Sequence, residues 1–329
     1  MGKPRRYFPT NTPYFVTNRL AEGLPFVANL YINLMLFGIL ARASYKYPGI
    51  NICAFLFLAN HYHMILVLRS DPQQLARFMN YVDGEIAKLV VRWLGKRNVK
   101  VWAQEYHAAV LLTAESTFQK MVYTFTNPVA ANLVAKASEW FGCTSFYALE
   151  DRRPREYKWI LPSLAPRLPN GRFKKQLVRK LLNRIEETEA PSYYLHIKPF
   201  DWMSCFADTC GRSEDEMKER LYAELYRAEM EAAQTRKREK KTVANRTLLE
   251  EQNPHKHYKP TKFGRRVFCI SSDRELRIAF IALYKEFCEQ AQAAYQAWCD
   301  GFIDVPMPHG MFAPARGPRG SILPIHQVT

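Results

Sequence analysis

Residues 55–66 read Phe55-Leu56-Phe57-Leu58-Ala59-Asn60-His61-Tyr62-His63-Met64-Ile65-Leu66. They link two apolar runs, Ile50 to Phe57 and Tyr62 to Leu68, whose β-branched and aromatic residues predict two neighbouring strands with a bend near Ala59-Asn60. Side chains two residues apart on a strand point to the same face. The second strand is therefore expected to present His61 and His63 together and to turn Tyr62 toward the opposite, apolar face.

Two imidazoles that converge from a rigid strand can offer two nitrogen ligands to a divalent cation. The alternative is a pair of ordinary surface or core histidines, which is the more common meaning of an isolated His-x-His. A second pair with the same spacing, His255-Lys256-His257, lies between Pro254 and Pro260 and has no strand context. We therefore expect only His61 and His63 to act as a ligand pair in a functional site.

Strand and helix patterns alternate on both sides of this pair. They predict a strand at Tyr14–Thr17, a buried helix at Phe26–Tyr45, a helix at Gln73–Leu94 ended by Gly95, a strand at Ala108–Leu112 and a helix at Thr117–Thr126. Asn127-Pro128 is expected to interrupt that helix, and Val129–Trp140 to form another. The order β-α-β-β-α-β predicts an α+β, ferredoxin-like split βαβ domain with helices on a mostly antiparallel sheet.

Tyr123 and Asn127 are four residues apart, which puts them on one helix face if the helix continues between them. A phenol and an amide oxygen would then face the same point. The alternative for Asn127 is an N-cap, because Pro128 would follow it at the first position of a new helix. The alternative for Tyr123 is an ordinary core tyrosine, since the chain contains 18 tyrosines.

The charge balance points to a polyanionic partner. The 329 residues include 47 Lys and Arg against 31 Asp and Glu, with a formal net charge of +16 and a pI of about 9.5. Such an excess favours a nucleic-acid phosphate backbone and, less strongly, an anionic membrane surface. Hydrophobic residues make up 48% of the chain, which excludes a wholly disordered protein.

The cysteines and the apolar segments indicate in which cellular compartment the protein works. The seven cysteines include no Cys-x-x-Cys pair, and the N-terminus has no signal-peptide pattern, so we expect reduced thiols and a cytoplasmic protein. The most apolar stretch, Phe26–Leu40, is interrupted by Asn29 and Asn33 and is shorter than the roughly 20 residues of a membrane span. It predicts a buried helix and no membrane partner.

Composition changes along the chain suggest four segments. Residues 1–150 form the predicted α+β domain, 151–171 a connector rich in proline and basic residues, 172–305 a mainly helical extension and 306–329 an irregular tail. Within the extension, the capping pattern at Ser213 predicts a helix to about Lys241, and the pattern at Ser272-Asp273 predicts another to about Cys299.

Two parts of the first 150 residues together resemble a known family. Leu58–Leu66 resembles the HUH motif (His, hydrophobic, His) of the single-tyrosine HUH transposases. Val101–Gln104 and Tyr123–Val129, which ends in Asn-Pro-Val, resemble the tryptophan-containing strand entry and the tyrosine helix of the REP-associated tyrosine transposases. The resemblance runs from residue 5 to about residue 145, and Pro254–Pro314 also resembles a C-terminal extension of a bacterial branch of these proteins.

This resemblance implies a transposase-like, metal-dependent single-stranded DNA endonuclease and strand-transferase that acts at DNA hairpins such as repetitive extragenic palindromes. Residues 1–150 would be its HUH domain. Tyr123 would be the nucleophile that forms a 5′-phosphotyrosine, and a magnesium or manganese ion would be held by His61, His63 and Asn127. The sequence leaves open whether the enzyme is a monomer or a homodimer with shared active sites.

Candidate DNA contacts are basic or aromatic, because phosphates attract cations and bases stack on rings. The basic candidates are Lys3, Arg5, Arg6, Arg92, Lys96, Arg97 and Lys100, and the aromatic candidates are Tyr7, Phe8 and Trp102. The alternative for each basic residue is a solvated surface charge. For the third metal ligand, Gln104 or Glu105 is an alternative to Asn127.

Two other functions are compatible with the sequence. One is a DNA- or RNA-binding regulator of the same fold that does not cleave. The other is a metal-dependent hydrolase in which water attacks and Tyr123 is structural. We favour the enzyme with a tyrosine nucleophile, because a binding protein has no need of the set His61, His63 and Tyr123.

Overall fold

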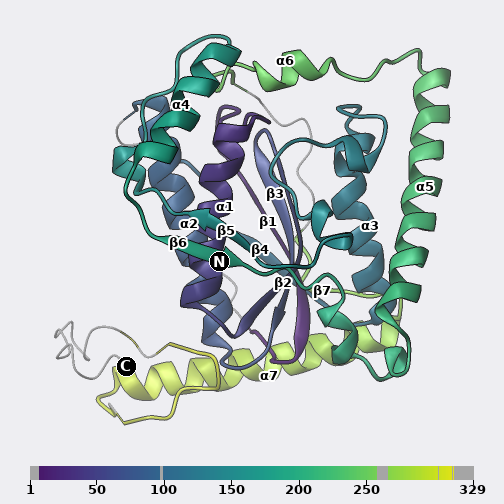
Figure 1. The fold of residues 1–329 in the computed structure, drawn as a ribbon. Coiled ribbons are helices and arrows are strands. Elements are labelled where there is room, and N and C mark those ends of the chain that lie inside the picture. The colour runs from purple at the N-terminus through teal and green to yellow at the C-terminus, as the bar shows by residue number, and fades with distance from the viewer. Residues whose placement is uncertain (1–6, 97–98, 258–265, 303, 313, 315–329) are drawn as a thin grey trace.

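The computed structural model describes residues 7–96, 99–257, 266–302, 304–312 and 314. A five-stranded sheet with the order β2-β3-β1-β4-β7 lies at its centre (Figure 1). Its strands are β1 (Thr12–Arg19), β2 (Ile50–Leu58), β3 (His61–Leu68), β4 (His107–Leu111) and β7 (Cys269–Ile270). The first four pair antiparallel, and the short β7 joins β4 in parallel. The predicted α+β class with a mostly antiparallel sheet is therefore confirmed, and β7 is an addition from the extension.

The hairpin β2–β3 sets the position of the histidine pair. Leu58 pairs with His61 across the turn formed by Ala59 and Asn60. On the other side of β3, the register with β1 puts Arg19 opposite His61 and Thr17 opposite His63. The two histidines therefore lie at the turn end of a central strand.

Helices α1 (Leu30–Lys46) and α2 (Gln73–Leu94) cover one face of the sheet. α1 begins four residues later than the sequence predicts, because the Asn29 side chain accepts a hydrogen bond from Ile32 N and caps the helix there. α2 has the predicted bounds, and Gly95 ends it in the left-handed region with φ 62°.

Helix α3 (Ala114–Ala130), on the opposite face, corrects one expectation. It runs through Asn127-Pro128 without interruption, since a proline in the last turn removes only one backbone hydrogen bond. The chain leaves the helix at Asn132, whose φ of 56° is left-handed. The predicted helix Val129–Trp140 is wrong: beyond Ala130 that stretch contains turns and a single 3-10 turn at residues 137–139.

The predicted connector, which contains β5 (Arg155–Lys158), and the first part of the extension cover α1. Strands β5 and β6 (Ser192–Leu195) form an antiparallel hairpin on α1, and α4 (Lys175–Glu187) lies between them in sequence and also contacts α1. Gly38 makes this packing close, because a Cβ at that position would overlap the carbonyl group of Lys158.

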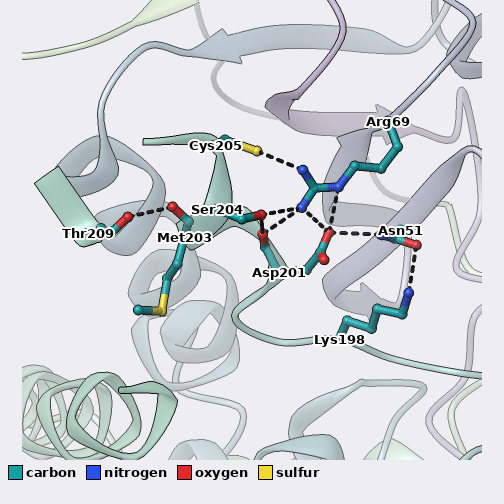
Figure 2. Close-up of polar contacts among 8 residues, drawn as sticks. All are labelled: Asn51, Arg69, Lys198, Asp201, Met203, Ser204, Cys205 and Thr209. Carbon is teal, nitrogen blue, oxygen red and sulfur yellow. Dashed lines mark hydrogen bonds and ion pairs between the residues drawn. The ribbon is translucent and has the colours of Figure 1, made fainter. Parts of the chain in front are cut away.

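Arg69, directly after β3, attaches the segment around Asp201 to the end of that strand. Its guanidinium pairs with Asp201 Oδ2 at 2.7 Å and donates to Asp201 O at 2.7 Å and to Ser204 Oγ at 2.6 Å (Figure 2). Asn51, at the start of β2, donates to the same carboxylate at 2.9 Å. The short 3-10 helix Asp201–Cys205 is thereby attached to the edge of the sheet.

The rest of the extension borders α3 and β4. α5 (Glu214–Arg238) begins with the predicted capping box at Ser213 and packs along α3 (Figure 1). The short α6 (Arg246–Glu250) follows, and α7 (Arg274–Cys299) begins after its cap, Asp273. All seven cysteines lie in the described residues, and none forms a disulfide.

Candidate active site

The strand alternation predicted for β3 is present in the structure. Tyr62 is fully buried on the α1–α2 face, where its hydroxyl donates to Asp83 Oδ1 at 2.6 Å. Ile65, two residues beyond His63, packs on the α3 face. The rings of His61 and His63 lie edge to face with their centroids 5.1 Å apart. Two imidazoles are therefore next to each other on the face of the sheet that α3 covers.

Helix α3 brings Tyr123 and Asn127 to the same place. The ring of Tyr123 meets the ring of His63 edge to face at a centroid distance of 5.2 Å. Asn127 Nδ2 lies 3.3 Å from His63 Nε2. Because α3 is continuous, Asn127 is not an N-cap, and both residues face His63 as the four-residue spacing predicts when the helix continues. Tyr123 is 44% exposed, so it is not a core tyrosine.

Phe15 and Lys120 complete the surroundings of the tyrosine, and the sequence reasoning missed both. The Phe15 ring, on β1, stacks on His63 at 5.3 Å, and Lys120 Nζ lies 4.8 Å from the centre of the Tyr123 ring. Lys120 precedes Tyr123 by three residues and Asn127 by seven, which is the spacing of one helix face. That spacing is the signal by which the sequence could have revealed it.

Burial favours the neutral form of both histidines. Burial, with the charge of Arg19, lowers the pKa of His61 to about 4. Burial also lowers the pKa of His63 well below its ordinary value, with further contributions from His61, Lys120 and Arg19. Burial lowers the pKa of Lys120 as well. Neutral imidazole is the form of histidine that binds metal ions.

The donor set of the site fits a divalent cation. His61 Nδ1 lies 2.8 Å from Asn60 Oδ1, and this hydrogen bond leaves Nε2 with a free lone pair. His63 Nδ1 is buried without a hydrogen-bond partner among the described residues. Rotation of the Asn127 amide about its terminal bond would present Oδ1 to the site in place of Nδ2. Two imidazole nitrogens and one amide oxygen form a mixed set that first-row divalent ions accept.

The structure also bears on the alternatives for the third ligand. Gln104 and Glu105 line a cavity of about 1190 Å³ on the α2 side of the sheet, together with Asn18 and Asp83. Within the described part of the chain, no group of three or more His, Cys, Asp or Glu side chains has a metal-binding arrangement. Among the candidates, the amide of Asn127 is the one that contacts His63.

The candidate DNA contacts lie in several places. Lys3, Arg5, Arg6 and Arg97 are outside the described residues. Arg92 and Lys96 line a smaller cavity of about 430 Å³ beside Arg167, and the Nε of Arg92 donates to Ala165 O at 2.5 Å. Lys100 is exposed and lines the larger cavity. Within the described residues, no hydrogen bond, ion pair or ring contact joins Arg92, Lys96 or Lys100 to His61 or His63.

The aromatic candidates have partners within the fold. Trp102 is half-buried, and its Nε1 donates to the carbonyl group of Asp83 at 3.0 Å. Phe8 is buried in the core, and Tyr7 packs against Phe287 of α7 at 5.0 Å. The second histidine pair is also engaged elsewhere: His255 Nε2 lies 3.2 Å from Leu168 O, and His257 lies 3.5 Å from a carboxylate oxygen of Glu22.

Comparison with known proteins gives one solved structure to report. The chain is similar to a REP-associated tyrosine transposase bound to a REP hairpin, with 18% sequence identity and a TM-score of 0.38 over 45% of this chain and 84% of that chain. No protein-family model and no curated protein matches the chain. Among the described helices, none is long and apolar enough to cross a membrane.

Proposed function

We propose that this protein is a metal-dependent endonuclease and strand-transferase for single-stranded DNA, transposase-like in its chemistry, with Tyr123 as nucleophile. The observation that supports it is the meeting of His61 and His63 from β3 with Tyr123 and Asn127 from α3 around one point. Hairpin DNA as the substrate follows from the motif resemblance, and the net charge of +16 suits a polyanion.

In this proposal His61, His63 and the amide oxygen of Asn127 hold the cation. Bound there, a magnesium or manganese ion would polarise the scissile phosphate and neutralise its developing charge. The partly buried Lys120 adds positive charge beside Tyr123, where it stabilises the anionic phosphate oxygens. Phe15 packs on the rings of His63 and Tyr123 and holds them in place. Its ring centroid lies 5.9 Å from that of Tyr123.

The covalent step exchanges one phosphodiester for another. The Tyr123 hydroxyl oxygen attacks the phosphorus, the bond from phosphorus to the 3′-oxygen breaks, and the phenol proton is transferred overall to that leaving oxygen. The products are a 5′-phosphotyrosine and a free 3′-hydroxyl. Attack by a 3′-hydroxyl on the phosphotyrosine reverses the exchange and rejoins strands, so no nucleotide cofactor is consumed.

The test is formation of a covalent adduct. The purified full-length protein is incubated with labelled single-stranded hairpin DNA and magnesium or manganese, and denaturing electrophoresis detects protein-bound DNA. Tyr123→Phe removes the nucleophile, and Tyr226→Phe, at an exposed position on α5, is the matched control. We expect a metal-dependent adduct with wild type and with Tyr226→Phe, and none with Tyr123→Phe.

The other results identify the alternatives. Cleavage without an adduct means that water is the nucleophile and that the protein is a hydrolase. Tight binding without cleavage across varied hairpins means a non-cleaving regulator. An adduct that survives in Tyr123→Phe contradicts the assignment of the nucleophile.

A further inference from the structure

The solvent side of α4 carries a cluster of basic side chains that have no ion-pair partners among the described residues. Residues 172–184 contain six basic and no acidic residues, and α4 then ends in two exposed glutamates at 186 and 187. All six basic side chains are exposed: Arg172, Lys174, Lys175, Arg179, Lys180 and Arg184. We call these six side chains the α4 basic face. Within the described residues none of them forms a salt bridge or donates a side-chain hydrogen bond to another protein group.

The helical period explains why these charges gather on one side. Leu181 is buried, and Leu177, Val178, Leu182 and Ile185 are partly buried against the main core. These apolar residues form one stripe, so the basic residues between them face solvent. From Lys175 to Arg184 the helix rises about 13 Å at 1.5 Å per residue.

The next α-helix in the sequence, α5, shows that such a surface is not general in this chain. On α5, Lys218 pairs with Glu150 and Arg220 with Glu115, both at 2.6 Å, and Arg227 pairs with Glu224 at 2.9 Å. Three of the six basic residues of α5 are therefore paired with carboxylates. Those on α4 repel one another at some cost to folding, which a polyanionic partner would offset.

Backbone contacts connect α4 to the end of the sheet that carries the histidines. Phe173 N, just before α4, donates to Glu251 O at 3.0 Å, and Leu24 N donates to Pro254 O at 3.2 Å. The segment that contains Leu24 returns to the β2–β3 turn, where Phe26 N donates to Ala59 O at 3.2 Å. In Figure 1, α4 lies toward the same end of the molecule as that turn. α4 packs on α1, on the face opposite the histidines, so a ligand bound at both places passes around the end of the sheet that carries the β2–β3 turn.

We infer that the α4 basic face is a second docking surface, which binds the phosphate backbone of duplex DNA in the stem of the hairpin. This inference rests on the proposed function for the choice of ligand. The spacing suits a duplex, since about 13 Å corresponds to about four base-pair steps of 3.4 Å. An anionic membrane fits less well, because a membrane-surface helix also exposes large apolar side chains and α4 exposes none.

The test measures how binding depends on salt. The variant Arg179→Gln/Lys180→Gln/Arg184→Gln keeps good helix formers at exposed positions, so it should fold. The matched control Arg227→Gln/Arg274→Gln/Lys285→Gln removes the same charge from exposed positions on α5 and α7. Fluorescence anisotropy gives the affinity of each full-length protein for a labelled hairpin with a long stem and for a single strand without a stem.

Each phosphate contact contributes about 0.9 to the slope of log affinity against log salt on duplex DNA. We expect the α4 variant to lose about 2.7 from this slope on the hairpin. Raising salt from about 50 to about 200 mM would then weaken wild type about 40-fold more than the variant. The control should keep the wild-type slope, and affinity for the single strand should change little in either variant.

Two results would overturn the inference: an unchanged slope in the α4 variant, or an equal loss of slope in the control, which would indicate only the overall field of the protein. The Tyr123 adduct on hairpin DNA is measured separately. If wild type forms the adduct and the α4 variant keeps its slope, the inference fails and the proposed function stands. If the slope falls but wild type forms no adduct, the docking surface stands and the proposed function fails.

Discussion

The Tyr62 hydroxyl donates a 2.6 Å hydrogen bond to Asp83 Oδ1 on the face of the sheet opposite His61 and His63. Asn18, on β1, donates to the other oxygen of the same carboxylate at 2.8 Å. Asp83 thus joins the two central strands to α2 directly behind the histidine pair. Tyr62 lies between the two histidines in β3, so this hydrogen bond anchors the part of the strand that carries them.

Loss of this buried bond should destabilise the protein. In Tyr62→Phe the ring still fills its site, but Asp83 loses a buried hydrogen-bond donor, and we expect a loss of about 1–3 kcal/mol in the free energy of unfolding. Tyr45→Phe, at a residue that is 72% exposed, should change it by less than about 0.5 kcal/mol. Urea denaturation measures both, and equal stability of the two variants would contradict a structural role for the bond.

Two glycines should respond to alanine in opposite directions. Gly38→Ala would drive a methyl group into the carbonyl group of Lys158, and we expect a loss of about 1–3 kcal/mol as the β5–β6 hairpin shifts. Gly84→Ala, within α2, meets nothing within 4 Å and should gain about 0.5–1 kcal/mol from helix propensity. Thermal unfolding of the two variants gives the sign directly. A gain in Gly38→Ala would mean that the hairpin does not pack on α1.

Arg220 should contribute more to stability than Arg227 does. Its guanidinium pairs with Glu115 at 2.6 Å and lies 4.0 Å from the centre of the Phe118 ring, so it joins α5 to α3. We expect Arg220→Ala to cost about 1 kcal/mol, with the ion-pair part weakening in high salt. Arg227 pairs within its own helix, and Arg227→Ala should cost less than about 0.5 kcal/mol. Chemical denaturation at low and high salt separates them.

The metal-free protein should lose stability in mild acid. The pKa of His61 is lowered to about 4, and that of His63 is also lowered, so below about 6.5 the unfolded chain binds protons that the folded chain does not. Stability from these groups is therefore complete above about pH 6.5 and falls as the pH drops toward 4. Denaturation in EDTA at several pH values tests this. A double variant, His61→Gln/His63→Gln, should show a flatter pH dependence, and identical profiles would contradict the expectation.

The side chain at position 127 should control metal affinity. Asn127→Ala removes the amide that contacts His63, and we expect at least about tenfold weaker binding of Mn²⁺. Asn127→Asp supplies a carboxylate at the same place and should bind Mn²⁺ at least as tightly as wild type. Isothermal titration with Mn²⁺ measures the affinities. Unchanged affinity in Asn127→Ala would exclude this side chain as a ligand.

Much of the candidate site could be predicted from the sequence because its determinants are local. Strand alternation alone places His61 and His63 on one face and Tyr62 on the other. Helical spacing alone puts Tyr123 and Asn127 on one face, provided the helix continues. The sequence could not decide whether the helix continues through Asn127-Pro128. The local preference of Asn127 against the helical conformation is overcome by the packing of α3 on the sheet, which the sequence does not show.

Only the tertiary structure shows which residues far apart in the chain are in contact. The sequence predicts α5 from its capping box, but not that Arg220 reaches Glu115 or that α5 lies along α3. It likewise contains the basic residues of α4 but not the packing of α4 on α1. Local periodicity determines which side of an element is apolar, whereas the choice of partner for that side depends on which distant surfaces bury each other best, and no short stretch of sequence contains that information.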